Sequence, residues 1–501
     1  MSGRLPPRRD SVKASRLSTQ LQKRRDAARQ RQRDARRDLT DHARSLAFGA
    51  EDSGSEAGAT RAVGDQDAMH RSSSNPQELA LEHPGTSSTE AWLDVAQMGR
   101  ESHHERSPRH RRSSSAPGKW SRESVARFSE SQFMLPEWMV DVPPDLGHAW
   151  FATPRPKGQR VLVISSRGCT VSRLKNGRVL HRFPSALPGG SQRTKHGKAE
   201  DSFCILDCVF HQEDGVYYVM DCMAWNGMSM YDCTAEMRLS WLYSKLGDPE
   251  TAECEAATGT GPNNRYRFAV PPTHNCDASG LRAAYGSPVP FRRDGIQFLA
   301  KDGNYELGVT PLAVMWKDPN TSDFFLDENP DGSDTQRVVL SLQSATGDVV
   351  TGDPTPIALA RLPAQFLESA GRAAESAPAG GDSIGRDGTW RGNGGLRDGL
   401  LLRFAVGKGG LQIQDGLPVA ADLVYEGIAN QRRGGADTMT KILFQYYARR
   451  EPITIEEIGM AVETQAREAA MAASSGSSAS SVSIARSSQS FSGIPNGLFD
   501  F

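Results

Sequence analysis

The stretch Met134-Leu-Pro-Glu-Trp-Met-Val-Asp-Val-Pro-Pro-Asp-Leu-Gly147 opens the segment that decides the fold of this chain, and Phe183-Pro-Ser-Ala-Leu-Pro-Gly-Gly190 closes it. Between these ends, Val161-Leu-Val-Ile164 has the length and composition of a buried strand. Ser165-Ser-Arg-Gly168 follows directly, where a strand-to-turn nucleotide site would place its reactive group. The segment therefore predicts the centre of a folded domain.

The composition indicates a folded body preceded by a basic arm. Hydrophobic residues make up 37% of the 501 residues and the mean hydropathy is -0.52, which is low for a chain that folds throughout, so part of it is expected to be disordered. The net charge of -1 combines about +9 over residues 1–47 with about -10 over the remainder. We expect the arm to bind an acidic partner.

The seven cysteines are odd in number and form no Cys-x-x-Cys pair, which favours buried thiols over disulfides or a zinc site. No apolar run is long enough to span a bilayer, and the first residues are rich in Arg and Pro rather than apolar. We therefore expect a soluble intracellular protein that binds no membrane, no metal ion and no cofactor.

The arm has the pattern of a helix from Arg16 to Ala47. Its small and apolar residues recur at helical spacing on one narrow stripe: Leu17, Leu21, Ala28, Ala35, Leu39, Ala43 and Leu46. Such a helix is marginal in water, so we expect it to become ordered on an acidic partner. Charge and periodicity alone favour a solvated helix or a non-specific RNA-binding arm.

Beyond the arm, residues 51–125 are rich in Ser, Gly, Glu, His and Arg and predict a disordered linker. Residues 126–465 predict one folded domain with a mobile insert at about 371–396, and residues 466–501 predict a disordered tail. Short β-branched and aromatic runs predict strands at Val161–Ile164, Phe203–Leu206, Val216–Met220, Tyr266–Val270, Ile296–Leu299, Leu312–Met315, Val338–Leu342 and Leu400–Phe404. With amphipathic helices predicted at 234–246 and near 453–460, the fold class is α+β with a mixed, largely antiparallel sheet.

Several short blocks, in this order, resemble the snurportin family of nuclear import adaptors. They are Leu135-Pro-Glu-Trp138, Asp141-Val-Pro143, Asp145-Leu-Gly147, Ser166-Arg-Gly168, Leu187-Pro-Gly-Gly190, Ile205-Leu-Asp-Cys208 and Thr310-Pro-Leu312 followed by Trp316. The resemblance covers the basic N-terminus and roughly residues 130–320. It implies a domain with the fold of mRNA guanylyltransferases and ligases that binds the trimethylguanosine cap of spliceosomal small nuclear RNAs.

The catalytic motif of those enzymes is missing. They attach a nucleotide to the lysine of Lys-x-Asp-Gly, because an amine is needed to form the phosphoramidate. At the matching place this chain has Ser165 for the lysine and Arg167 for the aspartate, and Lys-x-Asp-Gly occurs nowhere else. Asp294-Gly-Ile-Gln-Phe298 and Trp316-Lys317 look like remnants of later enzyme motifs. We therefore expect no catalytic residue and no enzyme activity.

A trimethylated cap needs a stacking surface, an apolar wall and cations for its phosphates, because its N7-methylated base is cationic and lacks N2 donors. The resemblance assigns cap binding to Leu135, Pro136, Trp138, Gly158, Gln159, Arg160, Lys175 and Trp316. Trp316 would be the stacking platform, and Lys175 would contact phosphate. Pro136 and Gln159 replace a family serine and lysine. From the residues alone, each Trp fits a core position at least as well, and Lys175 fits a solvated hairpin.

The resemblance also implies that the arm binds importin-β. The matching residues are Arg24, Arg25, Arg29, Arg33, Arg36, Arg37, Leu39, His42, Arg44 and Leu46. The expected partners are trimethylguanosine-capped small nuclear RNA, its ribonucleoprotein particle and importin-β, with shuttling between cytoplasm and nucleus. The hydrophobic start through which animal snurportins contact an export receptor is absent from Met1-Ser-Gly-Arg-Leu-Pro-Pro7, which leaves that contact open. Two rivals remain: a nucleotidyltransferase using another lysine such as Lys301, and a general RNA-binding protein.

Overall fold

In the computed structural model, the chain is described over residues 11–34, 39–49, 132–192, 194, 202–247, 254–257, 265–327, 329, 332–363, 383–384, 390–391, 398–414, 416–430 and 435–476. All of these residues belong to one compact unit. The predicted linker at 51–125 lies outside the described residues.

The first sheet is built around two strands that are buried along their whole length, β6 (Phe203–His211) and β7 (Val216–Trp225). The strand order is β5 (Val179–Phe183), β4 (Cys169–Leu174), β3 (Gln159–Ser166), β6, β7 and β8 (Met228–Ser229), and β9 (Phe268–Ala269) pairs parallel with β7. The thiols of Cys204, Cys208 and Cys222 are buried here. Strands buried on both faces read as continuous apolar runs, which is why the sequence predicts them clearly.

The second sheet has the order β1 (Met134–Trp138), β12 (Gly308–Trp316), β11 (Arg293–Ala300), β2 (Trp150–Pro156) and β10 (His274–Asn275). The pair of β1 with β12 is parallel, and the other pairs are antiparallel. The register of the parallel pair shifts between Pro136 and Glu137. A proline has no backbone N–H to donate to a neighbouring strand, so it is tolerated on an edge strand but not on a central one. As the edge strand of this sheet, β1 can therefore contain the Leu-Pro-Glu-Trp block.

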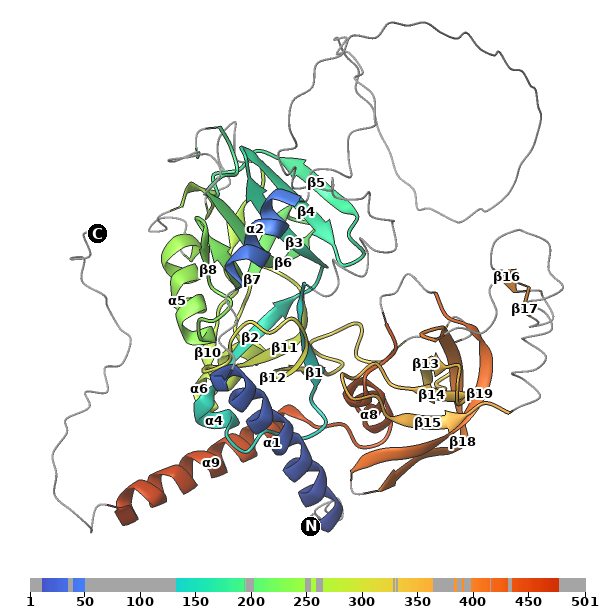
Figure 1. The fold of residues 1–501 in the computed structure, drawn as a ribbon. Helices are drawn as coiled ribbons and strands as arrows, with labels where there is room; N and C mark the ends of the chain where they lie inside the picture. Colours follow the sequence, from blue (N-terminus) through green and yellow to red (C-terminus); the bar gives the residue numbers. More distant parts are fainter. Residues whose placement is uncertain are drawn as a thin grey trace, which may run out of the picture. The chain divides into compact units, whose positions relative to one another are not determined.

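A third, antiparallel sheet follows in the C-terminal half, with the order β15 (Ala358–Arg361), β14 (Asp348–Val350), β13 (Arg337–Gln343), β18 (Leu401–Gln414) and β19 (Leu417–Ile428). Its edge strands β15 and β19 approach each other, so the sheet curls toward a barrel (Figure 1). The insert between β15 and β18 contains a short strand pair, β16 (Ser383–Ile384) with β17 (Trp390–Arg391).

The helices are α1 (Ser11–Asp34), α2 (Thr40–Gly49), α4 (Leu146–Ala149), α5 (Ala235–Leu246), α6 (Ala278–Gly286), α8 (Met439–Ala448) and α9 (Ile455–Gly476), with a 3-10 turn at Glu255–Ala257. Thr234 caps α5, because its side chain accepts a hydrogen bond from the backbone N–H of Met237. None of the helices in the described part of the chain combines the length and apolarity needed to cross a bilayer.

The α+β class is confirmed, and the predicted strands and the helix at 234–246 are present, although Tyr266–Val270 contains only the two-residue β9. The arm is not one helix. It forms α1 and α2, separated after Asp34, and both lie against the body (Figure 1). Helix α9 continues to Gly476, beyond residue 466, where the tail was expected to begin.

Candidate functional site

The turn at the end of β3 carries no amine. Ser165, where the enzymes have their lysine, is fully buried and donates a hydrogen bond from Oγ to Pro188 O at 2.8 Å. Arg167 and Gly168 follow with φ of 49° and 85°, so the chain reverses tightly into β4. Ser166 Oγ donates to Ala47 O of the arm at 2.8 Å. The turn is a packed hairpin that offers no nucleophile for a phosphoramidate.

The Pro-Gly-Gly block packs against this hairpin. Gly189 O accepts a hydrogen bond from Gly168 N at 2.7 Å. Gly189 has φ of +70°, and a Cβ there would lie 2.2 Å from Ser202 O. A side chain at this position is therefore excluded both by backbone conformation and by space. The role of the Pro-Gly-Gly block is to stabilise the β3–β4 turn.

Arg160 ties β1 to the first sheet. Its guanidinium donates to Asp207 at 2.9 Å and 2.5 Å and to Met134 O at 2.6 Å, and it lies 5.2 Å from the centroid of the Phe133 ring. Tyr305 OH donates to the same carboxylate at 2.8 Å and accepts from Met134 N at 3.0 Å. Burial alone would lower the Arg160 pKa, but the charge and hydrogen bonds of Asp207 outweigh it and raise that pKa. Three of the five Arg160 donors are thereby used within the fold.

The register of β3 brings four predicted cap residues to one end of the sheet. Val161 pairs with Leu174, so Arg160 and Lys175 lie one residue beyond that pair. Gly158 in the β2–β3 turn and Gln159 at the start of β3 precede Arg160 and are exposed, and Lys175 is exposed in the β4–β5 turn. Because Arg160 bonds Met134 O, Leu135 is close to this end of the sheet. The residues predicted to contact the cap phosphates therefore lie at the same end of the sheet.

Trp138 lies at the other end of β1, and Trp316 is at the end of the adjoining β12. Trp138 is half-buried, with its ring centroid 4.8 Å from that of Phe444 in α8 and Lys317 Nζ 5.7 Å away. Trp316 has no exposed surface and donates from Nε1 to Ile453 O at 2.9 Å. It packs with Tyr285, Ile458 and Val462. Stacking on Trp316 would require this packing to open, whereas Trp138 is partly accessible.

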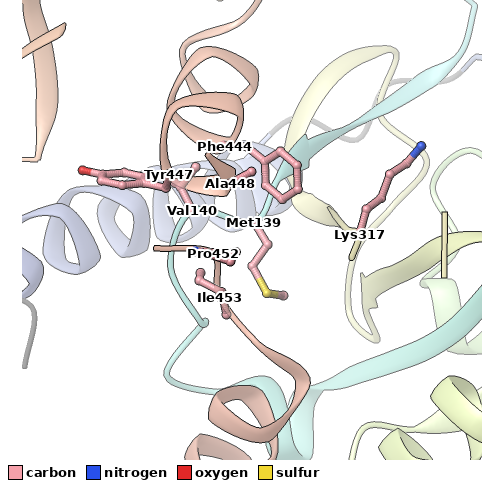
Figure 2. Close-up of a pocket in the computed structure, with 8 residues that line it drawn as sticks. All are labelled: Met139, Val140, Lys317, Phe444, Tyr447, Ala448, Pro452 and Ile453. Carbon is pink, nitrogen blue, oxygen red and sulfur yellow. The ribbon is translucent and has the colours of Figure 1, made fainter. Parts of the chain in front are cut away.

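Beside Trp138 lies a small pocket with a volume of about 10 Å³ that is partly open to solvent. Its lining residues, shown in Figure 2, are Met139, Val140, Lys317, Phe444, Tyr447, Ala448, Pro452 and Ile453. Pockets that bury small ligands usually enclose about 300–1,000 Å³. The pocket is therefore too small by itself to hold a trimethylated guanine.

The remnants of the later enzyme motifs form an ion cluster. Lys317 Nζ lies 2.5 Å from Asp294 Oδ1, Arg155 pairs with the other oxygen of this carboxylate, and Ser322 Oγ donates to Oδ1 at 2.6 Å. Burial lowers the pKa of Lys317. These three groups occupy the carboxylate. Its ion pair with Lys317 joins the start of β11 to the residue that follows β12.

The carboxylates Asp207 and Asp221 were predicted to be structural rather than metal-binding. Asp221 accepts from Arg238 Nε at 2.7 Å and Nη2 at 2.9 Å, and Asp207 is held by Arg160 and Tyr305. Within the described residues, no group of three His, Cys, Asp or Glu side chains is arranged to hold a metal ion. The two aspartates are buried partners of arginines, which confirms the structural prediction.

One residue of the Leu-Pro-Glu-Trp block received no role from the sequence. Glu137 is buried, with 4% of its side chain exposed, and its charged partner is Arg24 Nη2 of the arm at 2.5 Å. Burial raises the pKa of Glu137, opposed by Arg24. The one hint in the sequence was a glutamate within an otherwise apolar block. Its partner Arg24 lies 113 positions away along the chain, so the local sequence could not predict the ion pair.

The predicted importin-β contacts divide into three groups. Arg24, Arg25, Arg29, Leu39, His42 and Leu46 lie against the body, Arg33 and Arg44 are exposed, and Arg36 and Arg37 lie outside the described residues. The arm is therefore ordered on acidic side chains of its own chain, and its binding to an acidic partner stays a prediction.

The described residues form an α+β fold of mixed and antiparallel sheets, with a buried serine at the turn after β3. Residues 132–319 match the family model described as "Snurportin1, m3G cap-binding domain", and this part of the chain is snurportin-like.

Three solved structures are similar to the chain at low level. A mycobacterial DNA ligase D complexed with ATP and MES is 13% identical, covering 61% of this chain and 98% of that chain at a TM-score of 0.27. The ligase domain of M. tuberculosis LigD is 15% identical, covering 60% and 96% at 0.26. A Lig E DNA ligase is 11% identical, covering 59% and 98% at 0.23. Such TM-scores carry no argument about activity.

Proposed function

We propose that this protein is an import adaptor that binds the trimethylguanosine cap of small nuclear RNAs through residues 132–319 and links the ribonucleoprotein particle to importin-β through its arm. The observation that carries the proposal is the match of residues 132–319 to a snurportin cap-binding domain. The partly accessible Trp138 ring of β1 supports it, because a cationic base gains from an indole face. The adaptor would shuttle between cytoplasm and nucleus.

We also propose that the protein is not an enzyme and does not transfer nucleotides. A buried serine stands where nucleotidyl transfer needs an amine. The rival nucleophile, Lys301, donates from Nζ to His148 O at 3.0 Å and lies 5.2 Å from the Phe151 ring centroid. These contacts favour a structural role for Lys301. Incubation of the full chain with labelled GTP and a divalent metal should leave no label on the denatured protein; a retained label would refute this part.

Cap binding is tested by titrating the full chain with trimethylated and monomethylated cap dinucleotides while following tryptophan fluorescence. The expected result is quenching that is stronger for the trimethylated cap and that Trp138→Ala reduces. Stacking on an aromatic side chain contributes about 1–3 kcal/mol per base, so the variant should lose roughly 5- to 150-fold in affinity. Val424→Ala, an exposed position on β19, is the control. Equal weak quenching by both caps would refute the proposed ligand.

A further inference from the structure

The arm is seated on the body through apolar contacts to three separate clusters. Leu17 and Leu21 pack with the residues of the third sheet and α8, and Ala28 packs with Trp150 and Trp316. Leu46 and Ala47 of α2 pack with β3 and β6. The arm thus crosses the body from the C-terminal sheet to the first sheet (Figure 1).

Ion pairs hold the same helix along β1 and its neighbours. Besides its contact with Glu137, Arg24 Nη2 is 3.6 Å from Asp353 Oδ1. Arg29 pairs with Asp145 at 2.8 Å and with Asp302 at 3.0 Å. Arg25 is 3% exposed, and burial lowers its pKa. Arg24, Arg25 and Arg29, three of the arginines assigned to a receptor, are therefore engaged with the body while the arm lies on it.

These contacts are of a kind that a second acidic partner can replace. Helix α1 carries few apolar side chains, and a helix of this composition is marginal when isolated. Its docking depends on charge, since the arm is basic and the body is acidic. A guanidinium cannot pair with the body and with a receptor at the same time. Receptor binding must therefore lift α1 from β1.

The same contact stands in the way of the cap. Glu137 lies between Pro136 and Trp138, and its buried carboxylate is paired with a planar cation, the Arg24 guanidinium. An N7-methylated guanine is also a planar cation, and although its N2 carries no donor, its positive charge is attracted to a nearby carboxylate as a guanidinium is. The guanidinium and the base therefore suit one carboxylate, which only one of them can occupy.

We propose that the N-terminal arm is a displaceable strap that competes with the RNA cap for the β1 face, with Arg24 occupying Glu137 in place of the cationic base. This inference rests on the proposed function. Because the strapped chain binds neither ligand, each ligand that displaces the arm assists the other. Cap and receptor then bind with positive coupling, and the coupling is reciprocal. Loaded chains are favoured over empty ones for transport.

The test compares trimethylated cap dinucleotide binding by the full chain and three full-length variants. Arg24→Gln removes the competing cation, Arg29→Gln loosens the arm at Asp145 and Asp302 outside the cap block, and Arg33→Gln changes an exposed arginine that bonds Gln30 on its own helix. If the arm is docked nine tenths of the time, freeing it raises cap affinity about tenfold. We expect an increase approaching this for Arg24→Gln, a smaller one for Arg29→Gln and none for Arg33→Gln.

Hydrogen exchange of the α1 amides gives a second reading on the same samples. Adding the cap dinucleotide to the unmodified chain should speed exchange in residues 17–33, and Arg24→Gln should do so without the cap. Equal cap affinity in all four proteins, with α1 exchange unchanged by the cap, would overturn the strap and leave cap binding intact. Absence of cap binding in all four proteins would overturn the proposed function, and the strap with it.

Discussion

Replacing Arg160 by methionine separates a structural role from a ligand-binding one. Methionine keeps the apolar stem but leaves Asp207, which is 1% exposed, without its cation. It also removes the donor to Met134 O. Removing one partner of a buried ion pair typically costs about 3–5 kcal/mol, because the remaining charge stays buried. The structure therefore predicts a destabilisation of this size.

The assay is urea unfolding followed by fluorescence, with cap titration of the native protein alongside. For an m-value of about 2–3 kcal/mol/M, the midpoint should fall by about 1–2 M. The double variant Arg160→Met/Asp207→Leu should lose less than the sum of the two single variants, since neither charge remains unpaired. Gln159→Met, at the exposed neighbouring position, should leave the free energy of unfolding within about 0.5 kcal/mol of the original. If Arg160→Met left stability unchanged while cap affinity fell, the argument from its hydrogen bonds would be refuted.

Three further predictions concern stability. Trp316→Ala should cost about 3–5 kcal/mol in urea unfolding because the ring is fully buried, and a loss below about 1 kcal/mol would contradict that packing. Gly189→Ala should destabilise by more than Gly215→Ala, which has a similar φ of +68° but open space around a Cβ; equal losses would show that Ser202 O does not restrict the site. Burial raises the pKa of Glu137 above 4.5, so the stability associated with its protonated form is present at low pH and is lost as pH rises through the raised value. Glu137→Gln should therefore flatten the dependence of the urea midpoint on pH between 4.5 and the raised value, and unchanged curves would contradict the assignment.

The strands at the centre of the fold could be predicted because their signal is local. Phe203–Leu206 and Val216–Met220 are continuous apolar runs, and both lie in strands buried on both faces. The β1 edge strand contains a proline and a glutamate, so no periodicity marks it; only the resemblance pointed to its importance. The end of α9 was missed because Ser, Ala and Gly after residue 471 lack an apolar period.

The candidate site was predictable as a set of residues but not as an arrangement. Register places Arg160 and Lys175 together, yet nothing local shows that the Arg160 guanidinium is bound by Asp207. Trp138 and Trp316 look alike in sequence, and their difference in exposure arises from α8 and α9, more than 100 positions away. Tertiary contacts at such separation carry no short-range signal, so the cap-binding assignments for these residues stay predictions.

The cysteines of the first sheet have a consequence for chemical labelling. Burial raises the pKa of the thiols of Cys204, Cys208 and Cys222, and a protonated thiol inside the sheet neither alkylates nor oxidises readily. Cys169 and Cys233 are partly accessible. Timed alkylation of the native chain should therefore modify accessible thiols first and reach the buried ones only when β6 and β7 separate. The rate at which the buried cysteines are alkylated therefore reports how often the first sheet opens.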